Sequence, residues 1–373
     1  MNKNSIFLVD PMSYSNLGLY DKNLLENTPV KDKVLFGNIK YEHTLNSKFD
    51  VRLIYSYSEK SGLRKLISYC NSQLILLIKV IIYKPKIVHF QWFKLPLVDL
   101  VLVLLVKLFN SKTQLIFTAH NILPHDSKEK LKLIYSIIYK YVDKIIVHDR
   151  FSEVKIIDIF SLSKFKLKVI PHGILEIAKD DLDKNQMKVK LTFAMLGFLS
   201  NYKGLDLLID AWEGSNYLSN NDSINLVIAG DANKDVVKDL ERIAKIQNVS
   251  VINKYLDSAC FNKLLLESDV LILPYREISQ SGIMMSGLVY KKAFVVSNTG
   301  GLIEPFELGK VGWILEETTV NCLRDKLELI CKNPIEVKEI KNNHKLWNSV
   351  NEYYSWKKIG YETLSFYMSN YEK

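Results

Sequence analysis

The chain has 373 residues, a length that indicates about two domains, and its 48% apolar content excludes intrinsic disorder for most of it. Its four cysteines show no CxxC spacing, which argues against a zinc site or a disulfide framework and favours a reducing cytoplasm. The net charge of +9 comes from the first half: residues 1–175 hold 26 Lys+Arg and 14 Asp+Glu, whereas residues 176–373 hold 24 and 27.

This asymmetry suggests a nucleic-acid or membrane-surface partner for the first half. A lysine-rich, AT-biased genome would produce the same excess without any partner. We expect an anionic membrane surface as partner and no nucleic acid. The N-terminal residues lack the form of a secretory signal, so we expect a cytoplasmic protein, peripheral at the inner face of the cell membrane.

Short apolar runs alternate with longer helical stretches along the chain. Their continuous apolar character predicts strands that are buried on both faces of a parallel sheet, and the alternation indicates βαβ units. Helices are expected at Leu205–Trp212, Val236–Lys245 and Cys260–Glu267. The predicted strands are Ser5–Val9, Val51–Tyr55, Ile87–Phe90, Leu115–Thr118, Ile145–Val147, Val169–Ile170, Leu191–Leu196, Asn225–Ala229, Val249–Ile252, Val270–Leu273 and Phe294–Ser297.

Two longer apolar runs could be mistaken for membrane spans, Leu74–Tyr83 and Leu97–Phe109. Both fall short of the roughly 18 to 20 residues that a spanning helix needs. Lys79, Asp99 and Lys107 also interrupt them. We therefore predict buried or interfacial helices.

The segment 176–190 breaks the alternation and is rich in lysine and aspartate, which indicates a linker. It predicts one doubly wound domain over 1–175 and a second over 191–345. The aromatic-rich stretch 346–373 is expected to be a terminal helical segment. The only D-x-D pattern, at 181–183, lies in the linker and is not interpreted as a metal motif.

In open α/β sheets, ligands bind beyond the carboxyl ends of the strands. The strand ending at Leu196 is followed by the loop Gly197–Gly204, which carries Lys203 and leads into a helix. Exposed backbone N–H groups and a helix N-terminus make such turns anion sites. The loop has neither GxGxxG nor GxxxxGK[ST], so the dinucleotide and P-loop motifs are excluded. An ordinary surface loop with a solvated lysine is the alternative.

A second loop, 274–282, follows the strand ending at Leu273 and precedes an apolar helix. Ser281 is predicted to cap that helix, and Gly282 would let a ligand approach its partly positive N-terminus. Glu277 stands where it could accept hydrogen bonds from sugar hydroxyls. A capped helix beside a solvated Arg276–Glu277 pair is the alternative. The loop 298–301 adds a backbone-rich turn at the same edge.

In the first half, the strand ending at Thr118 is followed by His120, Asn121, His125 and Asp126. A lone histidine is usually structural, but this cluster lies at a strand end. Metal binding is weakly supported, because no third ligand has suitable spacing.

These loops resemble those of the retaining glycosyltransferases of family 4, which have the GT-B architecture. The resemblance is strongest over 273–304, 196–208 and 118–125, and 171–173 resembles the family's hinge. It implies an α/β fold of two Rossmann-like doubly wound domains facing a cleft, with the C-terminal helix packing back on the N-terminal domain. It also implies an acceptor-binding first domain and a nucleotide-sugar-binding second domain.

The resemblance implies catalytic roles for three residues. Lys203 would neutralise the donor diphosphate, Glu277 would hold the donor sugar, and His120 would sit at the reacting sugar. Asn121 and His125 would bind the acceptor. The implied donor-binding residues are Gly18, Gly197, Arg276, Gln280, Ser281, Gly282 and Ile283.

Two positions depart from the family pattern. The second glutamate of its E-x7-E motif falls on Met285, and the arginine that often follows the lysine-loop glycine is Phe198. Lys203 is then the main cation expected at the diphosphate.

We therefore expect a hexosyl-type transferase that moves a sugar, with retention, from a nucleotide sugar to a saccharide or lipid-linked acceptor in bacterial surface polysaccharide synthesis. No metal or other cofactor is expected, since Lys203 and helix termini can replace a divalent cation. A sugar-nucleotide epimerase, an inverting transferase and a non-catalytic nucleotide-sugar-binding protein stay open.

Overall fold

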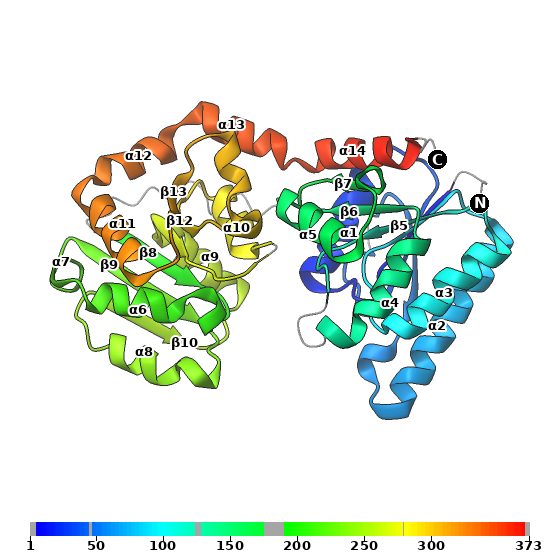
Figure 1. Ribbon diagram of the computed structural model, residues 1–373, viewed down its shortest axis with the longest axis horizontal. Coiled ribbons are helices and arrows are strands. Elements are labelled where there is room, and N and C mark those ends of the chain that lie inside the picture. The colour runs from blue at the N-terminus through cyan, green and yellow to red at the C-terminus, as the bar shows by residue number, and fades with distance from the viewer. Residues whose placement is uncertain (1–4, 45–46, 124–127, 175–189, 279, 370–373) are drawn as a thin grey trace. The chain divides into compact units, whose positions relative to one another are not determined.

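The computed structural model in Figure 1 describes residues 5–44, 47–123, 128–174, 190–278 and 280–369. The chain divides into two units, the first formed by residues 1–175 with 354–373 and the second by residues 176–353. Most of the predicted linker, 176–189, lies outside the described residues, as does the D-x-D pattern.

Unit 1 contains a seven-stranded parallel sheet with the order β3-β2-β1-β4-β5-β6-β7. Because every strand is parallel to its neighbours, all carboxyl ends lie at one edge. The strands are β1 Ile6–Val9, β2 Lys33–Asn38, β3 Asp50–Tyr55, β4 Ile87–Phe90, β5 Gln114–Thr118, β6 Lys144–Val147 and β7 Leu167–Val169.

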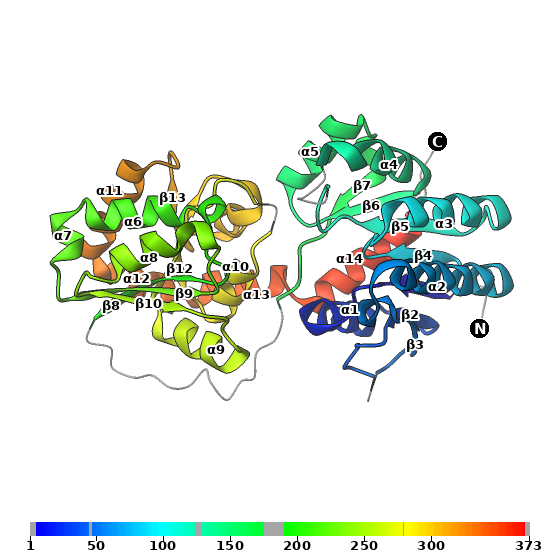
Figure 2. The same cartoon turned by 90° about the horizontal axis from the view of Figure 1, so that it is seen from below.

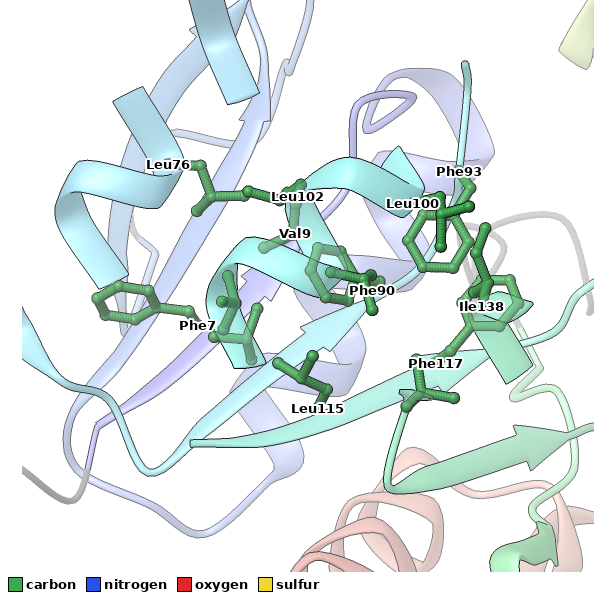
Figure 3. Close-up of a cluster of buried hydrophobic side chains, with 14 of the residues drawn as sticks. Phe7, Val9, Leu76, Phe90, Phe93, Leu100, Leu102, Leu115, Phe117 and Ile138 are labelled. Carbon is green, nitrogen blue, oxygen red and sulfur yellow. The ribbon is translucent and has the colours of Figure 1, made fainter. Parts of the chain in front are cut away.

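Helices cover both faces of this sheet, so its strands are apolar on both sides. In β1, Phe7 and Val9 pack in one hydrophobic cluster (Figure 3), whereas Ile6 and Leu8 pack in another. The first cluster lies under α2 to α5 and the second under α1 and α14. These helices are α1 Ser15–Asn27, α2 Gly62–Tyr83, α3 Pro96–Phe109, α4 Lys128–Tyr141, α5 Arg150–Phe160 and α14 Trp356–Met368.

The C-terminal helix α14, red in Figure 1, packs on α1 of unit 1, which confirms the prediction for the chain's end. The approach is close: a Cβ on Gly360 would stand 2.2 Å from the Asn27 carbonyl oxygen. Lys144 of β6 anchors the far end, since its buried Nζ donates to the carbonyls of Tyr367 at 3.1 Å and Ser369 at 2.7 Å. A lysine at a helix C-terminus satisfies carbonyls that lack an intrahelical partner.

Unit 2 contains a six-stranded parallel sheet with the order β10-β9-β8-β11-β12-β13. Its strands are β8 Leu191–Leu196, β9 Ile224–Gly230, β10 Val249–Asn253, β11 Val270–Leu273, β12 Ala293–Ser297 and β13 Gly312–Leu315. Its helices are α6 Leu205–Glu213, α7 Asn216–Ser219, α8 Val237–Ile243, α9 Ser258–Glu267, α10 Gly282–Val289, α11 Val320–Lys332, α12 Pro334–Asn342 and α13 His344–Tyr353.

Short 3-10 turns complete both units: η1 Tyr57–Glu59, η3 Lys164–Lys166, η5 Asn201–Lys203, η6 Lys234–Val236, η7 Gly300–Leu302 and η8 Glu304–Leu308.

The sequence prediction differs from the structure at four elements. It missed the strands β2 and β13, whose apolar runs are short and include or follow glycine. The run Leu74–Tyr83 is only the second half of α2, which has 22 residues and is long and apolar enough to cross a membrane. The terminal segment is two helices, because Ser355 caps α14 through a bond from the Lys358 N–H.

Candidate functional site

In unit 2, two predicted loops follow the neighbouring strands β8 and β11 and pack directly on each other. Gly204 has φ +73°, and a Cβ there would lie 2.2 Å from the Pro274 carbonyl oxygen. Gly197 has φ +93°, which also favours glycine. Lys203 lies between these two glycines in the sequence, so the close backbone contact of the loops fixes its position.

Lys203 is half-buried, and its side-chain Nζ has no hydrogen-bond or ion-pair partner among the residues that the structure describes, whereas its backbone N–H donates to the Ser200 carbonyl at 3.1 Å. Its Nζ lies 5.5 Å from the ring centroid of Tyr275 and 6.0 Å from that of Tyr202. It is also 3.7 Å from where a Cβ on Gly197 would stand. Burial lowers the pKa of this ammonium group to about 8. A partly desolvated cation without a counter-ion favours binding of an anion.

The N-terminus of α10 lies in the same loop region and is open. Ser281 caps the helix, since its Oγ accepts a bond from the Met284 N–H at 3.3 Å, as predicted. Gly282 is exposed, and a Cβ on it would meet no atom within 4 Å. Ile283 touches the lysine loop, with its Cδ1 3.1 Å from the position of a Gly197 Cβ. The helix N-terminus can therefore present its N–H groups to an anion beside Lys203.

Arg276 serves mainly to hold the two loops together. Its guanidinium forms a bidentate pair with Asp206 at 2.8 and 2.5 Å, and its backbone N–H donates to the Tyr202 carbonyl at 2.9 Å. Since Asp206 already occupies the guanidinium, contact between Arg276 and a donor phosphate stays a prediction.

The other predicted donor positions lie along the same loop. Glu277 is exposed and Gln280 is half-buried. Met285, at the position of the family's second glutamate, is 7% exposed and belongs to the core beneath α10. Phe198 is 46% exposed. Gly300 has φ +54°, and its Cβ would lie 1.7 Å from the Ile278 carbonyl oxygen, so the loop after β12 packs on this one.

In unit 1, histidines follow three neighbouring strands and form a chain of contacts. His120 follows β5, and its Nε2 lies 2.9 Å from Gln91 Oε1, which follows β4. Its Nδ1 lies 3.0 Å from Nε2 of His148, which follows β6. His148 Nδ1 in turn lies 2.9 Å from the Ile170 carbonyl oxygen.

The hydrogen bonds along this row of histidines allow one assignment of the N–H group of each ring when both rings are neutral. Burial lowers the pKa of His148 to about 3 and that of His120 well below its usual value, so both rings are neutral and carry one N–H each. His148 must donate to the Ile170 carbonyl, and His120 must then donate from Nδ1 to His148. The Nε2 of His120 is then left as an acceptor, so a hydrogen bond across its 2.9 Å contact with Gln91 requires the amide orientation that places the Gln91 NH2, and not Oε1, toward the ring.

Aromatic rings enclose His120 and limit its movement. The indole of Trp92 stacks on it with ring centroids 4.9 Å apart and an interplanar angle of 6°. The buried ring of Tyr20 packs edge-on at 5.2 Å and also contacts His172, which follows β7. Asn121 is half-buried beside His120, whereas His125 lies outside the described residues.

Gly18, one of the implied donor-binding residues, lies within a helix of unit 1. Helix α1 begins at Ser15, so Gly18 lies in the helix, where it is buried. A Cβ there would stand 3.1 Å from both the Ser13 carbonyl oxygen and the Tyr41 ring. Its predicted approach to donor phosphates stays a prediction.

Sequence reasoning did not assign five of these residues to a site, although it placed His172 in the segment 171–173 that resembles the family's hinge. They are Gln91, Trp92, His148 and His172 in unit 1 and Asp206 in unit 2. The first four lie just beyond strand ends, so the rule that found His120 would have found them too. No group of three or more His, Cys, Asp or Glu side chains that could hold a metal ion occurs within the described part of the chain.

Part of the chain matches a known protein family, and the fold matches solved structures. Residues 178–347 match the family described as "Glycosyl transferases group 1". No curated protein matches the sequence. Among solved structures, HepE of Anabaena in complex with UDP and glucose is 14% identical with a TM-score of 0.70, covering 97% of this chain and 98% of HepE.

Two further structures have similar scores. A glycosyltransferase from Rickettsia africae is 16% identical with a TM-score of 0.70, covering 98% of both chains. A sucrose-phosphate synthase from Thermosynechococcus elongatus is 12% identical with a TM-score of 0.68, also covering 98% of both. The fold is therefore the two-domain α/β fold of GT-B glycosyltransferases. This fold and the family match over residues 178–347 together support a group 1 glycosyltransferase.

Proposed function

We propose that this protein transfers a hexosyl group from a nucleoside-diphosphate sugar to a saccharide or lipid-linked saccharide, with retention at the anomeric carbon. The observation that carries the proposal is Lys203, a partly buried cation without a counter-ion beside the open N-terminus of α10. The group that best fits such a site is a diphosphate.

The proposed chemistry breaks the bond between the anomeric carbon and the diphosphate oxygen. Negative charge develops on the leaving oxygen, where the Lys203 ammonium and the N–H groups of Gly282 and Ile283 would stabilise it. The acceptor hydroxyl forms the new bond on the same face of the sugar and passes its proton to the leaving phosphate. Lys203 and the helix N-terminus supply the charge that a divalent cation would otherwise provide, so we propose no metal.

Side chains of both units would orient the sugars. We propose that Glu277 accepts hydrogen bonds from hydroxyls of the donor sugar, and that His120 accepts one at Nε2 in place of Gln91. Asn121 and His125 would contact the acceptor, which assigns the acceptor to unit 1 and the donor to unit 2.

The proposed cellular role is polysaccharide assembly at the inner face of a bacterial cell membrane. The positive excess of residues 1–175 supports a membrane-surface setting. Complexes of the structural neighbours contain UDP, UDP-glucose or ADP. Nucleotide sugars of uridine diphosphate and of adenosine diphosphate are therefore the donors to test.

A transfer assay followed by NMR of the product tests this proposal. We expect release of nucleoside diphosphate that depends on an acceptor, and a product with the anomeric configuration of the donor. Inversion would identify an inverting transferase, and an altered nucleotide sugar without transfer would identify an epimerase. Donor binding without turnover, for every acceptor tried, would leave a binding protein. Each of these outcomes would overturn the proposal.

A further inference from the structure

Helix α2 exposes apolar side chains where a surface helix normally exposes polar ones. The inner face of α2 packs on the sheet, while the outer face carries large aliphatic residues along the full 22-residue helix. The helical spacing places them in one continuous stripe. Its members include Leu63, Ile67, Leu74, Ile78, Ile81 and Ile82.

Helix α3 extends this surface. The two helices lie side by side in both views of unit 1 (Figures 1 and 2) and pack against each other. The outer side of α3 exposes Leu97, Val101, Leu108 and Phe109. We call the exposed apolar residues of both helices the α2–α3 face. Contiguous exposed apolar surface of this kind marks an interaction site.

The inner side of α2 shows that the helix lies along this surface and does not leave the domain. Tyr69 and Gln73 donate to the buried carboxylate of Asp99 at 2.7 and 2.6 Å, and Tyr55 donates to Gln73 at 3.1 Å. Ser72 donates to the Ile54 carbonyl oxygen at 2.6 Å. Inserting α2 across a bilayer would break these buried bonds and expose polar groups to lipid.

The segment that contains α2 and α3 is rich in positive charge, although Lys107 of α3 is paired with Asp143 at 2.5 Å. Residues 59–114 hold nine lysines and arginines but only two acids, Glu59 and the buried Asp99. No charged residue occurs between Lys65 and Lys79, so the middle of the stripe is uncharged, with Cys70 and Asn71 exposed between Ile67 and Leu74. Exposed positive side chains lie toward the ends of the α2 stripe, at Lys60, Arg64 and Lys84.

We propose that the α2–α3 face docks on an anionic lipid bilayer, with its aliphatic side chains in the interfacial layer and the flanking lysines at lipid headgroups. A second copy of the chain would bring two positive surfaces together, whereas an anionic bilayer attracts one. An apolar helix face edged by basic residues is the form of an interfacial helix. The α2–α3 face would be the surface by which the protein meets the membrane, and this inference rests on the membrane setting of the proposed function.

Vesicle binding measured without donor or acceptor tests this inference separately from transfer activity. The variant Leu74→Gln/Ile78→Gln removes two residues that are 55% and 44% exposed and leaves the net charge unchanged. We expect its partitioning onto phosphatidylcholine–phosphatidylglycerol vesicles to fall by about tenfold or more. The matched control is Leu329→Gln/Ile335→Gln in unit 2, where the residues are 51% and 64% exposed. The control should bind as the wild type does.

A label at Cys70 reports contact directly, because this exposed cysteine lies on the outer side of α2 between Leu66 and Leu74. With the other three cysteines replaced by serine, an environment-sensitive fluorophore on Cys70 should shift to the blue when anionic vesicles are added. An unchanged spectrum, or equal losses of binding in the test and control variants, would overturn the inference. So would a stable wild-type dimer that Leu74→Gln/Ile78→Gln dissociates, because the face would then be a self-interface.

Discussion

The Nε2 of His148 lies 3.0 Å from Nδ1 of His120, and this contact assigns His120 a single tautomer. Burial keeps both rings neutral, and the Ile170 carbonyl takes the one N–H of His148. His120 therefore presents a lone pair at Nε2 and holds no proton there to give. It is suited to accept a hydrogen bond from a sugar hydroxyl, and it is not suited to general acid catalysis at neutral pH.

His148→Gln should be less stable than the wild type at pH 8, by about 1–3 kcal/mol for the lost buried bonds. The native pKa of His148, about 3, lies below its unfolded value near 6.5. The unfolded state therefore takes up a proton as the pH falls below 6.5, and the wild type loses that part of its stability. At pH 5 the loss is about 2 kcal/mol, so the gap to the variant should narrow by this amount. Urea unfolding of both proteins at pH 8 and pH 5 measures it, and a gap that widens toward pH 5 would contradict a neutral His148.

His120→Ala should lower kcat and kcat/KM together, because we place its contact in the transition state. His125→Ala should mainly raise the KM of the acceptor. Steady-state kinetics with both substrates varied distinguishes the two variants. If His120→Ala kept the wild-type kcat while His125→Ala abolished it, the two roles would be reversed.

Lys203→Ala should lower turnover by about 10² to 10³, the usual effect of removing one preorganised charge from a transition state. Because burial sets the pKa of the free enzyme's Lys203 near 8, kcat/KM for the donor should decline as the pH rises through 8. Lys203→Arg keeps its charge and should move that decline to higher pH. A folded Lys203→Ala with full activity would exclude the diphosphate role.

Glu277→Ala should impair sugar transfer more than nucleotide binding, since the carboxylate is assigned to the sugar and is exposed at the strand end. Titration with the free nucleoside diphosphate measures binding, and the initial rate measures transfer. Weakened nucleotide affinity with turnover intact would contradict the placement.

Two glycines of the donor loops should respond differently to alanine. Gly204→Ala puts a Cβ at φ +73° and 2.2 Å from the Pro274 carbonyl, and should cost about 1–3 kcal/mol of stability or more. Gly282→Ala meets no atom within 4 Å and should change stability by less than about 0.5 kcal/mol. It should still weaken donor binding, because the methyl group projects from the helix N-terminus. Thermal unfolding with and without donor measures both effects. Equal loss of stability in the two variants would contradict the close contact at Gly204 and the open space at Gly282.

The sequence predicted eleven strands within a few residues, because parallel strands covered on both faces are continuously apolar. It also located the loops of Lys203 and Ser281, whose glycines and cap are local features. It could not pair Arg276 with Asp206, which are far apart in the chain and meet only because β8 and β11 are neighbours. The contact of His120 with His148 was hidden for the same reason. The exposed stripe of α2 was missed because the prediction considered only the apolar run Leu74–Tyr83, whereas the helix begins at Gly62.

The stabilisation of the protein by ligand, compared between the wild type and Lys203→Ala, tests whether Lys203 binds the diphosphate of the donor. Thermal unfolding of the wild type and of Lys203→Ala would be followed over a panel of nucleoside diphosphates and their sugars. We predict that at least one nucleotide sugar raises the melting temperature of the wild type. Lys203→Ala should lose most of this shift, while its melting temperature without ligand changes little. A folded wild type that no member of the panel stabilises, or a Lys203→Ala variant stabilised as strongly as the wild type, would contradict this prediction.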